Sequence, residues 1–228
     1  AASAPWIERP ISAQADAFNE MAMRQVTDCL PPTPLALMFI TALLEQKIIL
    51  SSNRRSILHS ATVALRILLQ PLKWSHLLVP MVPTSLASDL IQYPAPFILG
   101  IPSEEAENAE LIGNLPRDVT LVDLDVGRVI LAPDFGQDNE MVQKSDDPSA
   151  TARALRSQVL YLAQGLGNVF GYSLKPESWL CDSAISPEME KVSESASDRL
   201  KTSARSFVAE LLEGKNLAMC IPKYHQRS

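Results

Sequence analysis

The stretch KIILSSNRRSILHSATVALRILLQPLKWSHLLVPMVPTSLASDLIQYPAPFILGIP, residues 47–102, decides the fold because it alternates two kinds of segment. Short aliphatic runs, bounded by Ser, Asn or Pro, have the length and composition of strands buried on both faces. Between them, longer segments repeat apolar residues at helical spacing. The predicted strands are 47–53, 76–80 and 96–101, and the predicted helices begin near Ser56 and Leu86.

The same alternation continues upstream. Thr33 is expected to cap a helix whose first residue is Pro34, and the apolar surface of that helix is wide enough for deep burial. Ser56 is the expected cap of the helix that follows the first strand, and Pro71 is expected to end it. Both helices are therefore predicted to pack on the sheet.

Downstream, the acidic run 103–110 is expected to form a solvated helix or loop, and VTLVDLD, residues 119–125, is expected to form a fourth strand. The segment DVGR that ends this strand reads as a turn. Strands that alternate with helices in this way are typical of a parallel sheet with crossover helices. The predicted fold class is α/β, with a C-terminal helical segment after the sheet.

Composition divides the chain into four parts. Past Ala132 the sequence becomes polar and rich in turn residues, which marks a linker before the helical segment. In that segment, helices are expected near 149–166 and 187–212, with Gly214 as the C′ residue of the second. The predicted parts are an N-terminal extension at 1–31, an α/β domain at 32–133, a polar linker at 134–148 and the helical segment at 149–228.

Charge and cysteine content narrow the function classes. The formal net charge of -6 gives no basic field for nucleic acid, and no Lys/Arg run exceeds Arg54–Arg55. Three scattered cysteines indicate neither a disulfide framework nor a zinc site, which favours a reducing, cytoplasmic setting. The longest apolar window, Pro34 to Leu44, is too short for a transmembrane segment. Without an initiating Met or a signal peptide, the chain is expected to be a fragment of a longer protein.

The string LVDLDVG, residues 121–127, is the most chemically suggestive motif. Asp123 and Asp125 at the end of a strand could hold magnesium beside a phosphate, and the string resembles the haloacid-dehalogenase phosphatases. Gly127 departs from that family's pattern, and no downstream lysine motif accompanies it. The favoured interpretation is an Asp-x-Gly turn whose carboxylates accept hydrogen bonds from turn amides.

Other candidate sites have structural interpretations as well. GLGNVFG, residues 165–171, follows a helical pattern rather than a strand, so it reads as a helix end with flexible turns and not as a phosphate loop. His59, His76 and His225 share no metal-ligand spacing, and no nucleophile motif is present. The sequence therefore predicts no catalytic residue, no metal and no cofactor.

The carboxyl ends of parallel strands are where such sheets usually bind ligands, so the loops there are the candidate partner-binding sites. They lie at 51–54, 81–85, 102–105 and 123–127. The candidate contact residues are Ser51, Ser52, Asn53, Arg54, Pro83, Thr84, Asp123 and Asp125.

Several motifs in a fixed order resemble the core of DENN domains. They include Glu45 at the end of a Leu-rich helix, Ser51–Ser52 after a strand, and Pro71 with Trp74 after the next helix. Further motifs are Pro80 and Pro83, the string PAPFILG at 94–100, and Asp123–Leu124–Asp125. The resemblance covers residues 32–133. The segment from residue 149 is expected to correspond to the family's downstream helical part, and residues 1–31 to a remnant of its upstream part.

The resemblance implies a guanine-nucleotide exchange factor for a Rab-type small GTPase in membrane traffic. Such a factor would bind the GTPase switch regions and favour the nucleotide-free state without covalent chemistry. Other parts of the parent protein would provide any peripheral membrane association. A trafficking scaffold that keeps the fold without exchange is the alternative, and an arginine finger from Arg54 or Arg128 that promotes hydrolysis is a further one.

Overall fold

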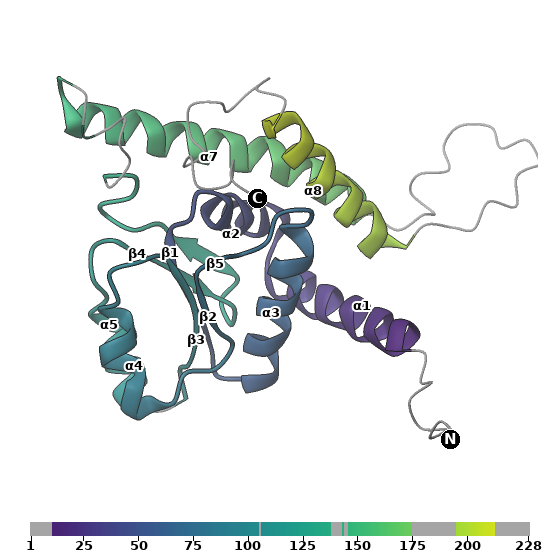
Figure 1. Cartoon of the computed structure of the whole chain (residues 1–228), viewed down its shortest axis with the longest axis horizontal. Coiled ribbons are helices and arrows are strands. Elements are labelled where there is room, and N and C mark those ends of the chain that lie inside the picture. The colour runs from purple at the N-terminus through teal and green to yellow at the C-terminus, as the bar shows by residue number, and fades with distance from the viewer. Residues whose placement is uncertain (1–10, 105, 138–142, 144–145, 175–194, 213–228) are drawn as a thin grey trace, which may run out of the picture.

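The computed structural model of the chain describes residues 11–104, 106–137, 143, 146–174 and 195–212. A five-stranded sheet lies at the centre, with helices against both of its faces (Figure 1). The predicted α/β class is confirmed.

The sheet contains the four predicted strands and one more. The order across it is β2-β3-β1-β4-β5, and the first four strands run parallel. The fifth strand pairs antiparallel with β4 and forms the edge, where the sequence predicted a turn at 125–128 and no further strand. The bounds are β1 Lys47–Ser52, β2 Leu77–Val79, β3 Phe97–Pro102, β4 Val119–Asp123 and β5 Arg128–Ile130.

The two faces of the sheet pack into two separate hydrophobic clusters. In β1, Ile48 and Leu50 point into the larger cluster, while Ile49 between them joins the smaller one. This alternation follows from the two-residue period of a strand. Helix α3 (Arg55–Leu68) covers the first face, and α4 (Thr84–Ile91) and α5 (Ala106–Gly113) cover the second (Figure 1).

Helices α1 (Ile11–Cys29) and α2 (Pro32–Leu43) precede the sheet, and α1 packs along α3. The predicted start of α2 is wrong by two residues, because Pro31 is the N-cap and Pro32 the first helical residue. Proline suits this position, since the first N–H groups of a helix have no intrahelical partner. Thr33 lies in the first turn and does not cap.

The predicted cap of α3 is also wrong. The N-cap residue is Arg54, which makes no side-chain cap, and Ser56 lies inside the first turn. A Ser or Thr cap contributes only about 1 kcal/mol, whereas α3 buries an apolar face along its whole length. Burial therefore sets where this helix begins.

Helix α7 (Pro148–Ser173) is longer than predicted and runs through GLGNVFG without a break, so the expected helix end at 165–171 is wrong. Its buried face lies on α2, and α8 (Ala196–Leu212) packs beside it (Figure 1). A Cβ at Gly167 would lie 2.7 Å from the Cα of Thr33, so this glycine permits the close approach of α7 to α2. The predicted start at residue 187 and the Gly214 stop lie outside the described residues, as does His225.

Within the described part of the chain, no single helix is long and apolar enough to cross a membrane. Helices α1 and α2 pass a length and composition test together, but their axes bend by 117° at the break between them, and α2 is buried in the fold. The domain boundaries at 31, 133 and 148 stay predictions.

Candidate functional site

The loops predicted to bind a partner meet along one edge of the sheet. Strands β3, β1 and β4 are parallel and in register, with Ser51 opposite both Ile101 and Asp123, so their carboxyl ends lie side by side. Backbone hydrogen bonds join the loops that follow. Leu124 N donates to Ser51 O at 2.9 Å, and Ser103 N donates to Ser52 O at 3.0 Å. We call this row of loops the carboxyl edge.

The Asp125 carboxylate holds the loop between β1 and α3 by two hydrogen bonds, and we call Asp125 with Ser52 and Asn53 the clasp. Its Oδ1 accepts from Ser52 Oγ at 2.7 Å, and its Oδ2 accepts from Asn53 N at 2.7 Å. Ser52 is fully buried, and its Oγ also accepts from Arg54 N at 3.0 Å. Six of the eight candidate residues are thereby brought together, namely Ser51, Ser52, Asn53, Arg54, Asp123 and Asp125.

The Asp123 carboxylate shapes the turn between β4 and β5. Its Oδ1 accepts from the backbone N–H groups of Asp125 and Val126 at 3.2 and 3.1 Å. Gly127 completes the turn with a φ of 75°, a conformation that favours glycine. A side chain there would also meet the carbonyl of Cys29, because an added Cβ would lie 2.7 Å from that oxygen. Both carboxylates of the D-x-D string thus accept hydrogen bonds from loop residues. This agrees with the favoured interpretation of the sequence.

Pro83 and Thr84 lie at the far end of the carboxyl edge, after β2, and β3 separates them from the clasp. Asn108 connects Thr84 to the end of β3, since its Nδ2 donates to Pro102 O at 2.9 Å and lies 3.5 Å from Thr84 Oγ1. Sequence reasoning missed Asn108, which is only 1% exposed. A lone asparagine in an acidic run gives no signal of such a role.

The clasp leaves a set of side chains facing solvent. Asn53 and Arg54 are exposed, and Val126 at the tip of the β4–β5 turn is 67% exposed. Arg128 Nε lies 3.6 Å from Asp123 Oδ2, and Arg55 Nε pairs with Glu104 Oε1 at 2.7 Å. Because all four charged groups of these pairs are at least partly exposed, the pairs contribute little to stability and remain open to exchange with a partner's charges.

Cys29 lies beneath this edge, with its Sγ 3.6 Å from Arg54 Nη2. Burial raises the pKa of the thiol above its ordinary value of 9.0, and the Arg54 guanidinium opposes this shift less strongly. A raised pKa disfavours the thiolate, which is the nucleophilic form. The half-buried thiol therefore acts here as a small packing group.

We expect alkylation of Cys29 by iodoacetamide to be slow below pH 9.0, because burial disfavours the thiolate, and to accelerate as the pH rises above that value. Mass spectrometry of the peptide that contains Cys29 measures the rate. The same reaction in concentrated urea is the control. Equal rates in the folded and unfolded chain would contradict the partial burial of this thiol.

A second prediction concerns the clasp itself. Asp125→Ala removes the acceptors of Ser52 Oγ and Asn53 N, and we expect the free energy of unfolding to fall by about 1–2 kcal/mol. Urea denaturation measures the change. Asp146→Ala is the matched control, because Asp146 is exposed and makes no hydrogen bond with the described residues, and we expect a change within about 0.5 kcal/mol. Equal effects of the two variants would show that the clasp does not hold the loop.

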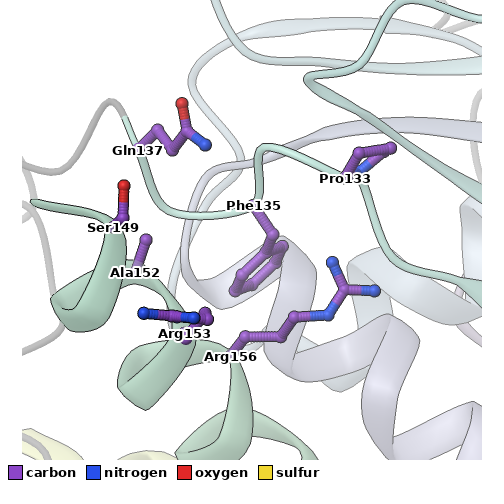
Figure 2. Close-up of a pocket in the computed structure, with 7 residues that line it drawn as sticks. All are labelled: Pro133, Phe135, Gln137, Ser149, Ala152, Arg153 and Arg156. Atoms are coloured by element: carbon purple, nitrogen blue, oxygen red, sulfur yellow. The ribbon is translucent and has the colours of Figure 1, made fainter.

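Elsewhere, a pocket of about 250 Å³ lies between the loop after β5 and the start of α7. Figure 2 shows Phe135 pointing from the loop toward the helix that carries Arg153 and Arg156. Arg156 Nη1 donates to Ala132 O at 2.7 Å, so one of the two guanidinium groups already anchors the loop. The sequence predicted a linker at 134–148 and a helix from 149, and no pocket between them.

Comparison with known proteins gives a family match. The family model of the DENN (AEX-3) domain matches residues 4–127, a stretch that begins before the resemblance found by inspection and ends within the β4–β5 turn. All the motifs at the carboxyl edge fall inside it.

Three named relatives are each similar to part of the chain. Elicitor of plant defense protein 1 of Gibberella zeae is 36% identical over 124 residues, which are 52% of this chain and 10% of the relative. DENN domain-containing protein 2B of Homo sapiens is 29% identical over 129 residues, 57% of this chain and 10% of the relative. MAP kinase-activating death domain protein of Mus musculus is 37% identical over 90 residues, 39% of this chain and 6% of the relative. The matches thus span a tenth or less of each relative.

Proposed function

Because the chain belongs to the DENN (AEX-3) domain family, we propose that it forms part of a module that binds a Rab-type small GTPase and promotes the release of its GDP. The module would act in the cytoplasm, where other parts of the parent protein would bring it to vesicle or organelle membranes. It would work as a regulator, without a covalent step.

The observation that carries this proposal is the clasp at the carboxyl edge. Asp125 bonds both Ser52 and Asn53, so two loops that are far apart in the sequence form one fixed surface. A surface fixed before binding loses little conformational entropy when a partner docks. An exchange factor needs such a surface, because its effect comes from binding the nucleotide-free GTPase more tightly than the loaded one.

The exposed groups on this surface fit a protein partner. Val126 offers an apolar contact at the tip of the turn, and the exposed Arg54 and Arg128 offer charged contacts. Arginine is among the residues that contribute most at protein interfaces. We propose that Arg54 and Val126 contact the switch regions, with Asn53, Pro83 and Thr84 at the margin of the same surface.

The test is the release of fluorescent GDP from a panel of Rab proteins, with this chain and its full-length parent compared at equal concentration. We expect the parent to accelerate release from at least one Rab. In the parent, Arg54→Glu is expected to reduce that acceleration at least tenfold, because it reverses a charge at the contact surface.

Arg66→Glu is the matched control. Arg66 is exposed in the last turn of α3, the helix that begins next to Arg54, so it lies roughly 18 Å away at 1.5 Å per residue. Equal losses of acceleration in both variants would show that the carboxyl edge is not part of the surface that contacts the GTPase. If no Rab gained or lost nucleotide affinity with the parent, a scaffold that binds without exchange would replace the exchange factor as the proposal.

A further inference from the structure

The outward side of α4 and the segment just after it carry two large apolar side chains, which precede and follow a carboxylate in the sequence. Leu86 is 49% exposed and Tyr93 is 43% exposed, and Asp89 between them in sequence is exposed too. Ala87 and Ile91 are buried against the sheet. The exposed residues therefore occupy the side of the helix that faces away from the core, and we call them the α4 face.

Leu86 precedes Asp89 by three positions, a spacing at which residues are neighbours on a helix surface. Tyr93 follows Asp89 by four positions and lies one residue past the C-cap Gln92. Tyr93 N donates to Leu90 O at 3.2 Å, which ties the residue after the C-cap to the last turn of α4. A carboxylate thus lies between an aliphatic side chain and an aromatic ring in the sequence.

The surroundings of the α4 face are acidic. From Leu77 to Pro116 the sequence contains no Lys, Arg or His, while acidic residues stand at 89, 104, 105, 107 and 110. Asp89 and Glu110, on two helices that pack together, have no ion-pair partner in the part of the chain that the structure describes. Two carboxylates without an ion-pair partner among the described residues attract a positively charged ligand.

The charge of this region decides between occupants. An anionic membrane surface would be repelled by Asp89 and Glu110, and a second copy docked face to face would place like charges against each other. A basic segment of another protein is not repelled by these carboxylates. Arginine fits the α4 face best, because its planar guanidinium pairs with a carboxylate and also stacks on an aromatic ring.

We propose that the α4 face binds an arginine-containing apolar segment of a partner protein, with the guanidinium on Asp89 and over the Tyr93 ring and an apolar neighbour on Leu86. The surface lies on the second sheet face, on the helix that begins at Thr84 at the margin of the carboxyl edge.

The first test selects ligands from a phage library of random 12-residue peptides against the full chain, with counter-selection against the Asp89→Lys variant. We expect enrichment of peptides with Arg flanked by Leu, Ile, Val or Phe. A selected peptide, labelled with fluorescein, should lose at least tenfold in affinity for Asp89→Asn and for Tyr93→Ala in anisotropy titrations. Glu20→Gln, an exposed carboxylate on α1, is the control and should leave the affinity unchanged.

Exchanging the charges of the peptide and the chain distinguishes a loss of recognition from damage to the fold. The peptide with Arg replaced by Glu should not bind the wild-type chain but should recover binding to Asp89→Lys. Selected peptides that lack arginine, or an affinity indifferent to Asp89, would overturn the proposal. A dimer in light scattering that Asp89→Lys disperses would also overturn it, because a second copy would then cover the face.

Discussion

The Gly100→Ala variant is expected to lose about 3 kcal/mol or more of the free energy of unfolding, enough to unfold much of a marginally stable domain. Gly100 lies in β3, next to the end of β2, where Val82 N donates to Gly100 O at 2.8 Å. An added Cβ would lie 1.9 Å from the carbonyl oxygen of Pro80. That oxygen belongs to the backbone and cannot rotate away, so the β2 end must separate from β3.

Circular dichroism and urea denaturation measure this loss. Gly113→Ala is the matched control, because a Cβ at Gly113 meets nothing within 4 Å at the exposed end of α5, and we expect a change within about 1 kcal/mol. A Gly100→Ala chain as stable as the Gly113→Ala chain would mean that the β2 end does not lie against β3 as described.

Two glycines in α7 should respond to alanine with opposite signs. At Gly167 an added Cβ would lie 2.6 Å from Thr33 Oγ1 and 2.7 Å from Thr33 Cα, so Gly167→Ala is expected to destabilise the chain by about 1–3 kcal/mol. At Gly165 nothing lies within 4 Å, and alanine favours a helix interior by up to about 1 kcal/mol. Gly165→Ala is therefore expected to stabilise it.

Thermal unfolding of the two variants measures the difference in sign. If both were stabilising, helix propensity alone would govern this segment and α7 would not pack closely on α2. If both were destabilising, the outer side of α7 at Gly165 would have to be covered, contrary to its exposure here.

The carboxyl edge illustrates what could be predicted about the site. Ser52, Asn53 and Asp125 were expected at loops, because aliphatic runs end just before them. The partners of their hydrogen bonds were not predictable, since Ser52 and Asp125 are 73 positions apart and meet only through the register of β1 and β4. Asn108 had no local signal, because its role depends on the positions of Thr84 and Pro102.

The errors in helix boundaries have a common cause. Thr33 and Ser56 were chosen for cap preference, which is worth about 1 kcal/mol, and the glycines of α7 for their low helix propensity, of similar size. Burial of a single large apolar side chain outweighs either term. Packing on α2 therefore carries α7 through three glycines to Ser173.

The sequence by itself determined the α/β class, the four parallel strands and the helices between them, because the apolar period within a segment reports which sides of it are buried. The tertiary structure alone decided the antiparallel edge strand β5, the full length of α7 and the loops that Asp125 holds together. Strand β5 has only three residues, too few to show a period. The other features depend on contacts between residues far apart in the chain, such as Gly167 with Thr33, which exist only once the elements have packed.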